Sequence, residues 1–462
     1  MYRTSADEFL GCSILFTAVD VGRKSQKPLL TKFMDVVENG SASLPDLKRV
    51  IIIRGENPFP SRFTTYEDML EEASLPHTVK IVNDLTKSID CHELCNFQFT
   101  SGTTGEPKAT TLTHYNVINN GLLIGHVMRL RQGEDIICCP PPLYHAFGLV
   151  LGLLACYTHG VAIVFPSWNF EPEAVMESVV KERCTGLLGV PTMLVAVLQQ
   201  YRQDPNRWGK LELRTGIAAG SPVPRYLMEQ LQAAFGMSEL VIIYGMTELS
   251  GASFITSVDD GMEEKLASVG KVIPHTLAKV IGPDGKILPC GTRGELCMAG
   301  FGVQKGYYKN PAKTNELMVK DQDNILWVHS GDEATLDSRG YCKITGRIKD
   351  MIIRGGENIY PFEIEQRLGQ HPAVSQSSVV GLKDEYYGEV VAAFLEQQAK
   401  SSRPPDSELQ EFVRKTLGRY NVPVHIFWVG PRGVIEDFPK TSSGKIKKLD
   451  LRTIGNEIIS SK

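Results

Sequence analysis

Residues 100–108 read Thr-Ser-Gly-Thr-Thr-Gly-Glu-Pro-Lys, a run of hydroxyl side chains and two glycines that ends on a lysine. The backbone N–H groups of such a loop can close around phosphate oxygens, because glycine lets the chain approach a ligand closely. The hydroxyls add donors, and Lys108 adds a mobile positive charge. The spacing differs from that of a Walker A loop. The stretch predicts a phosphate site, although a Ser/Thr/Gly cluster taken alone is more often a flexible surface turn.

Length and composition indicate a soluble globular protein. A chain of 462 residues is expected to form two or three domains. The net charge of −4 gives no electrostatic reason to expect a nucleic-acid or membrane partner. The cysteines lack a repeated Cys-x-x-Cys spacing, so we expect buried thiols, Cys138 and Cys139 among them, in a reducing compartment and no zinc site.

The longest apolar stretch, residues 146–165, is broken at 158–160 and falls short of the ~20 residues that span a bilayer. We expect a buried helix there, followed by a buried strand at 161–165, and no transmembrane segment. No signal peptide or presequence pattern precedes it, and the last residues are not a Ser-Lys-Leu tail. We therefore expect an intracellular protein of the cytosol or of a peroxisomal or mitochondrial matrix; the oligomeric state stays open.

The pattern of apolar residues, glycines and turn residues changes along the chain. Its middle alternates short apolar runs with helix-like stretches, which predicts an α/β sheet buried on both faces. The expected strands are 135–139, 161–165, 186–190, 214–218 and 240–244, and the expected helices are 171–183, 192–201 and 224–235. Frequent glycines and turn pairs over 271–348 predict a β-rich subdomain.

A small α+β domain is expected at the C-terminal end, over residues 349–462. Its predicted helices are 361–368 and 406–417, and its predicted strands lie near 377–381, 390–395 and 424–429. The fold class is thus α/β, with a large N-terminal domain over 1–348 and a junction at 346–350.

A second motif, Tyr244-Gly245-Met246-Thr247-Glu248, follows the apolar run 240–243. Polar groups at the carboxyl end of a strand lie where α/β sheets bind ligands. Glu248 offers the hard oxygen that suits magnesium. Taken alone, Glu248 is more often a carboxylate at a helix N-terminus.

Three further motifs complete the set. In Ser330-Gly331-Asp332 and the following Gly346-Arg347, an acid at a turn can accept from both ribose hydroxyls and an arginine can donate to ribose or phosphate. Gly355-Gly356 precedes a predicted helix as a close-approach loop, and Gly444-Lys445 ends a Ser/Thr-rich turn. Each is weak alone, since solvated turn charges and flexible loops are common.

All five motifs, in this order, resemble the adenylate-forming superfamily of acyl-CoA synthetases, nonribosomal adenylation domains and firefly luciferase. The closest resemblance is to medium-chain acyl-CoA synthetases of the family member 2 kind, over residues 95–448. It implies stacked αβ layers, a β-rich subdomain and a small mobile C-terminal domain. Because the family has a long αβ region ahead of the phosphate loop and only 99 residues precede Thr100, we expect the first αβ layer to be incomplete.

The resemblance also implies a role for each motif residue. ATP would contact Thr100, Ser101, Gly102, Thr103, Thr104, Gly105, Lys108, Gly220, Ser221, Tyr244, Gly245, Thr247, Asp332, Arg347 and Lys445. Within this set, Asp332 and Arg347 would hold the ribose. Thr247 and Glu248 would act at the phosphates, with Glu248 as the magnesium ligand. Lys445 would contact both the carboxylate and the α-phosphate, and it joins Thr247 and Glu248 as the catalytic residues.

The acyl group and coenzyme A would contact His145, Gly220, Gly245, Gly355 and Gly356, and the two lobes would hinge at Lys349. A buried, satisfied histidine remains an alternative for His145. The expected substrates are thus a carboxylic acid, ATP with Mg²⁺, and coenzyme A, in fatty-acid or secondary metabolism.

The acid is expected to be apolar. The stretch 144–165 contains no Asp or Glu to pair with an ammonium group, and its small residues are expected to leave room for methylenes. This favours a medium-chain or branched acid. Two alternatives stay open: an enzyme that loads an acid onto a carrier protein, and a shortened non-catalytic remnant that binds nucleotide.

Overall fold

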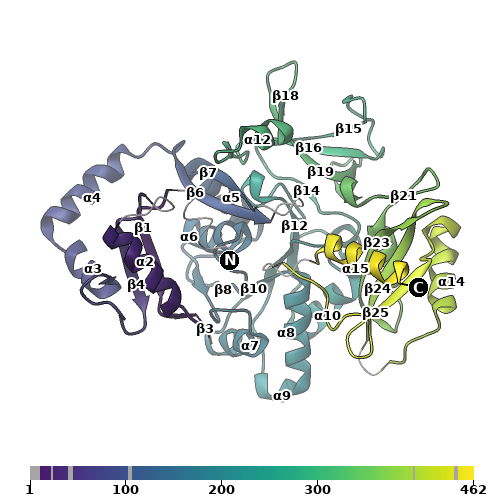
Figure 1. Ribbon diagram of the computed structural model, residues 1–462, viewed down its shortest axis with the longest axis horizontal. Coiled ribbons are helices and arrows are strands. Elements are labelled where there is room, and N and C mark those ends of the chain that lie inside the picture. The colour runs from purple at the N-terminus through teal and green to yellow at the C-terminus, as the bar shows by residue number, and fades with distance from the viewer. Residues whose placement is uncertain are drawn as a thin grey trace. The chain divides into compact units, whose positions relative to one another are not determined.

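The computed structural model describes residues 11–21, 24–39, 45–101, 107–398, 401–441 and 446–461 (Figure 1). The chain divides into two compact units, residues 1–93 and 94–462.

The first unit is a small parallel sheet with helices. Strands β1 (Ile14–Ala18), β4 (Arg49–Arg54) and β5 (Thr64–Thr65) pair in that order, and β2 (Asp20–Val21) pairs with β3 (Lys24–Ser25). Helix α2 (Lys27–Asn39) contributes Leu30 and Phe33 to a core with Val50 and Ile52 of β4. Helices α3 (Tyr66–Ala73) and α4 (Pro76–Ser88) bury none of their residues.

A seven-stranded sheet forms the centre of the second unit. Its order is β14 (Lys271–Val272), β13 (Phe254–Ile255), β12 (Glu239–Tyr244), β11 (Thr215–Ala219), β10 (Gly186–Gly189), β8 (Ile136–Cys138) and β9 (Ala162–Val164). The strands from β12 to β9 are parallel. Successive residues of β12 enter opposite cores, Leu240 and Ile242 on one face and Val241 and Ile243 on the other, so the predicted sheet buried on both faces is confirmed.

Helices cover both faces. Helices α5 (His114–Val127) and α6 (Ala155–Thr158) and the π-helix η1 (Phe147–Leu154) pack on the face that carries Val241 and Ile243. Helices α7 (Pro172–Lys181), α8 (Pro191–Gln203) and α10 (Arg225–Phe235) pack on the face that carries Leu240 and Ile242. Short helices α9 (Pro205–Trp208) and α11 (Met262–Ala267) complete this layer. Cys138 and Cys139 are buried, as predicted.

The prediction of a buried strand at 161–165 is wrong. Strand β9 is the edge of the sheet, Ala162 is exposed, and Phe165 is 45% exposed. An edge strand has only one neighbour, so an apolar sequence does not guarantee burial there.

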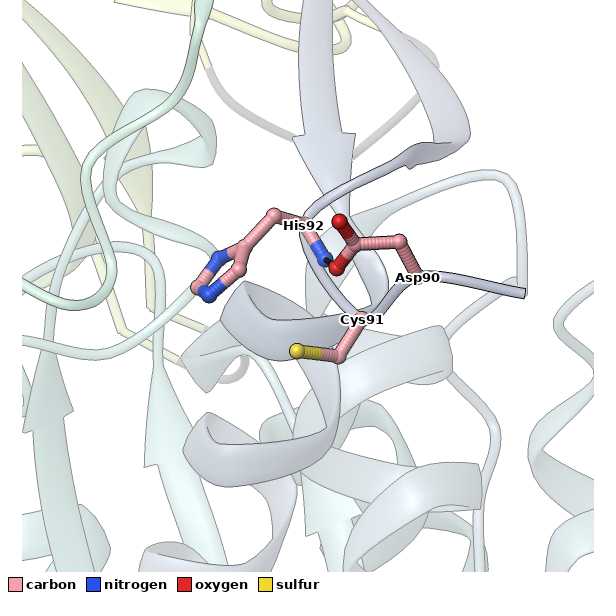
Figure 2. Close-up of side chains that lie close together, drawn as sticks. All are labelled: Asp90, Cys91 and His92. Carbon is pink, nitrogen blue, oxygen red and sulfur yellow. Dashed lines mark hydrogen bonds between the residues drawn. The ribbon is translucent and has the colours of Figure 1, made fainter. Parts of the chain in front are cut away.

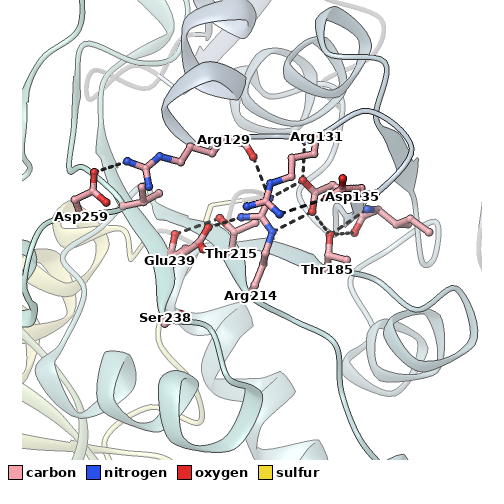
Figure 3. Close-up of polar contacts among 12 residues, drawn as sticks. Arg129, Arg131, Asp135, Thr185, Arg214, Thr215, Ser238, Glu239 and Asp259 are labelled. Carbon is pink, nitrogen blue, oxygen red and sulfur yellow. Dashed lines mark hydrogen bonds and ion pairs between the residues drawn. The ribbon is translucent and has the colours of Figure 1, made fainter.

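Charged side chains join the amino ends of the parallel strands (Figure 3). Arg214 precedes β11, and its Nη2 lies 2.5 Å from Asp135, which precedes β8. Arg214 also pairs with Glu239 at the start of β12. Thr185, which precedes β10, donates to Asp135 at 2.7 Å. Burial alone would raise the pKa of Asp135, but hydrogen bonds from Arg214, Thr185 and the backbone outweigh it and hold that pKa below its usual range.

Two antiparallel sheets adjoin this core. In the first, β6 (Leu94–Ser101), β7 (Pro107–Thr113) and β17 (Gly306–Tyr307) pair side by side. The stretch predicted to be β-rich holds a sheet of β15 (Thr276–Ile281), β16 (Gly294–Gly300), β19 (Leu326–Leu336) and β18 (Met318–Lys320), with β20 (Cys342–Arg347) on β19. Helix α12 (Pro311–Leu317) lies between β17 and β18 in the chain.

The C-terminal part is α+β. Strands β22 (Glu357–Ile359), β21 (Ile352–Arg354), β24 (Gly388–Gln397) and β23 (Val374–Asp384) pair in that order, and β25 (His425–Val429) joins β24. The predicted helices are confirmed as α13 (Pro361–Leu368) and α14 (Asp406–Leu417), and α15 (Lys448–Ser460) follows. Within the part of the chain that the structure describes, no helix is both long and apolar enough to cross a bilayer.

Candidate active site

The carboxyl end of β12 is the centre of the candidate site. Tyr244 ends the strand, and Gly245 follows it. A Cβ at Gly245 would collide with the carbonyl oxygen of Gly251, so only glycine lets the chain turn back here. The turn leads into the 3₁₀ helix η2 (Thr247–Leu249), which carries Thr247 and Glu248.

Glu248 is linked to the lysine of the phosphate motif through Tyr307. The Glu248 side chain is buried, and its Oε1 accepts a hydrogen bond of 2.6 Å from the Tyr307 hydroxyl. The Lys108 ammonium lies 4.8 Å from the centre of the Tyr307 ring. Burial and the charge of Glu248 raise the pKa of Tyr307, so its hydroxyl stays a donor. Tyr307 thus joins two motifs that are far apart in sequence.

Asp332 forms a second carboxylate centre, which is held by Tyr244, the residue before Gly245. Its Oδ2 accepts a hydrogen bond of 2.6 Å from the Tyr244 hydroxyl, and its Oδ1 lies 3.3 Å from Arg347 Nε. Asp332 and Arg347 are direct partners in the β19–β20 ladder. Burial and the charge of Asp332 raise the pKa of Tyr244. The structure therefore brings together Tyr244, Asp332 and Arg347, and their predicted contact with one ligand stays a prediction.

Three other predicted residues follow parallel strands of the same sheet. Gly220, with φ 88°, and Ser221 come after β11 and are exposed. His145 comes after β8 and is half-buried, and its ring lies 4.7 Å from that of Tyr144. Carboxyl ends of parallel strands share one edge, so these residues lie on the edge that carries Tyr244.

The phosphate motif is only partly described. Thr100 on β6 pairs with Lys108 on β7. Ser101 ends β6, and Gly102, Thr103, Thr104 and Gly105 lie outside the described residues. Lys445 lies outside them too. Their predicted roles stay predictions.

The glycine pair 355–356 forms the turn of the β21–β22 hairpin. Gly355 has φ 59° and Gly356 has φ 90°, so both have the positive φ that a two-residue hairpin turn of type I′ requires. Lys349 is exposed in the 3₁₀ turn η3 (Ile348–Asp350), between β20 and β21.

Contacts join the two sides of this predicted hinge. Arg293 Nη2 lies 2.5 Å from Glu363 Oε1, and its guanidinium lies 5.2 Å from the centre of the Tyr360 ring. Burial and a hydrogen bond with Glu333 raise the pKa of Tyr360 to about 12. Glu333 directly follows Asp332, so the segment after the hinge contacts the neighbour of a site residue.

The small residues of 144–165 do not leave room for the methylenes of an acid. The prediction that they would do so is therefore wrong. A Cβ at Gly148 would collide with the carbonyl oxygens of Pro141 and Pro142, and one at Gly152 would lie 2.7 Å from Cys139 Sγ. Ala155 is fully buried in the core. These residues are small because neighbouring chain segments occupy the space.

The residues Asp90, Cys91 and His92 lie close together on an exposed turn (Figure 2). The Asp90 carboxylate accepts the backbone N–H of His92 at 2.9 Å, which is the usual role of aspartate in a turn. We assign no metal to this group.

Comparison with known proteins identifies the family. Residues 10–308 match the model described as AMP-binding enzyme, and residues 363–445 match AMP-binding enzyme C-terminal domain. The chain is 47% identical over 453 residues to acyl-CoA ligase sidI of Beauveria bassiana, which covers 98% of this chain and 76% of the relative. It is 40% identical over 414 residues to mitochondrial medium-chain acyl-CoA ligase ACSF2 of Danio rerio, covering 89% of this chain and 66% of the relative.

A solved structure shares the fold. The anthranilate CoA ligase AuaEII, in complex with anthranoyl-AMP, matches with a TM-score of 0.80 at 21% identity, covering 99% of this chain and 81% of that one. The chain belongs to the AMP-binding, adenylate-forming enzymes, and the predicted fold is confirmed. Within that family it is an AMP-forming acyl-CoA ligase, an acid–thiol ligase that uses ATP.

Proposed function

We propose that this ligase activates an apolar, medium-chain or branched carboxylic acid as its acyl-adenylate and passes the acyl group to coenzyme A. The observation that carries the proposal is a pair of carboxylates that each accept a hydrogen bond from a tyrosine hydroxyl, Glu248 from Tyr307 and Asp332 from Tyr244. The tyrosine that holds the first carboxylate also has the phosphate-motif lysine over its ring, and the second carboxylate lies beside Arg347. ATP would thus lie across the end of β12, with its phosphates toward Glu248 and its ribose on Asp332.

The donor set fits Mg²⁺ on the phosphates. Glu248 Oε1 accepts from Tyr307, and among the described residues no hydrogen bond to Oε2 is found. A carboxylate oxygen is the ligand that magnesium prefers. The ion would offset phosphate charge, while Tyr307 fixes the Glu248 carboxylate in place.

The proposed chemistry has two steps. A substrate carboxylate oxygen attacks the α-phosphorus, the bond to pyrophosphate breaks, and a mixed anhydride with AMP forms. Lys445 and the phosphate motif stabilise the negative charge that develops, and Thr247 orients the phosphates. The thiol of coenzyme A then attacks the anhydride carbonyl and AMP leaves. In our proposal, Gly220, Gly245 and His145 border the acyl group, and Gly355 and Gly356 border the pantetheine arm.

The choice of acid rests on charge. The stretch 144–165 offers no carboxylate to an ammonium group, and an unpaired buried charge is costly. The Danio rerio relative is named a medium-chain ligase, which supports the same choice.

We expect kcat/KM to rise from acetate to octanoate, because each buried methylene contributes about 0.8 kcal/mol. Pyrophosphate release and AMP formation would be measured with straight and branched acids, anthranilate, leucine and phenylalanine. A preference for an amino acid, or equal values for acetate and octanoate, would overturn the proposed substrate class.

We also propose that residues 349–462 form a mobile domain that hinges at Lys349, since one site must serve two reactions. Lys349→Pro should leave one half-reaction and impair the other, because proline fixes φ near −65°. Adenylation and thioester formation from a supplied acyl-adenylate would be timed separately, with Lys349→Ala as the control. Wild-type rates in both half-reactions of the proline variant would place the hinge elsewhere.

A further inference from the structure

The turn that carries Asp332 is a bulge between two paired strands. Glu295 of β16 pairs with Glu333 of β19, and Cys297 pairs with His329. Three residues of β19, Ser330 to Asp332, therefore stand opposite the single residue Leu296. A bulge of this size leaves backbone groups without ladder partners, so side chains must hold it.

Glu295 provides that support with both carboxylate oxygens. Its Oε1 accepts the N–H of Gly331 at 3.1 Å, and its Oε2 lies 3.0 Å from His329 Nδ1. Ser330 completes the turn, since its hydroxyl donates to the Leu296 carbonyl and accepts the N–H of Asp332. Burial would raise the pKa of Glu295, but the hydrogen bonds from His329 and Gly331 lower it below its usual range.

Glu295, Cys297 and His329 also have the residue types of a metal site. Two observations argue against that use. The Cys297 thiol is fully buried, and burial raises its pKa to about 12, so a metal ion would have to displace its proton in apolar surroundings. Lys279 is the direct partner of Cys297 on β15, so a positive charge already lies beside the group. The arrangement instead supports the turn.

We propose that Glu295 is a positioning residue for the nucleotide, one that fixes the Ser330–Asp332 bulge so that Asp332 can receive the ribose hydroxyls. The inference rests on the proposed function, in which Asp332 binds the ribose. Glu295 does not touch substrate. It sets where the Asp332 carboxylate lies against Tyr244 and Arg347.

The test is discrimination between ATP and 2′-deoxy-ATP, measured as the ratio of their kcat/KM values for pyrophosphate release. Glu295→Ala should lower that ratio roughly tenfold, because the charged hydrogen bonds that hold the bulge are lost. Glu295→Gln should stay within about threefold of wild type, since its amide oxygen can accept from Gly331 and its NH₂ can donate to His329. KM for coenzyme A should be unchanged in both.

Asp332→Ala distinguishes a failure of the proposed ribose contact from a failure of the positioning role. If this variant discriminates between the two nucleotides like wild type, the proposed ribose contact fails and the inference fails with it. If Asp332→Ala loses discrimination but Glu295→Ala loses activity equally on both nucleotides, only the positioning role is overturned. Should Glu295→Ala not fold, Glu295→Asp decides: its shorter side chain cannot reach both partners, so we expect roughly threefold weaker discrimination, and wild-type discrimination would refute the role.

Discussion

Lys445→Ala is expected to slow adenylation by about 100–1,000-fold and to leave thioester formation from a supplied acyl-adenylate largely intact. In our proposal the Lys445 ammonium faces the carboxylate and the α-phosphate only while the new P–O bond forms. Its charge opposes the negative charge that develops at phosphorus. In the second step the leaving group is already AMP, so the same charge has less to stabilise.

The half-reactions would be followed separately, by pyrophosphate release for the first and by coenzyme A consumption for the second. Lys447→Ala is the matched control, because Lys447 is a nearby lysine whose ammonium lies 3.8 Å from Asp450. It should behave like wild type. Equal losses in both half-reactions of Lys445→Ala would contradict the proposed role of Lys445 in adenylation.

Arg214→Met is expected to lower the free energy of unfolding by about 3–5 kcal/mol, the usual result of removing one partner of a buried ion pair. The Asp135 side chain is only 2% exposed, so its charge would remain buried without the guanidinium. Glu239 would lose the same partner. Denaturant unfolding of the full chain measures the loss. Arg225→Met is the control, since Arg225 pairs with Glu263 on the surface and should change little.

The same cluster predicts a pH dependence. The pKa of Asp135 is lowered in the folded chain, so its contribution is complete above the unfolded value of about 3.9 and is lost as pH falls through the lower folded value. The stability difference between wild type and Asp135→Asn should therefore be constant from about pH 5 to 8 and shrink below about pH 4. A constant difference down to pH 2 would contradict the assigned cause.

Local patterns in the sequence determined much of this protein. Helices α13 and α14 begin and end at the predicted residues. Helix α13 starts at a proline and α14 starts directly after one, and a glycine directly follows the last residue of each. The parallel strands follow from apolar runs between helices. The order of the five motifs was enough to predict the family, since each needs residue types at fixed local spacing.

Only the tertiary structure decided which residues support those motifs. Tyr307 reaches Glu248 from 59 residues away, and Tyr244 reaches Asp332 across 88. Glu295 holds a turn 36 residues further along. No short-range pattern marks these partners, because strand register and burial select them once distant segments become neighbours. For the same reason, the sequence could not reveal that β9 is an edge strand or that neighbouring chain fills the space beside Gly148.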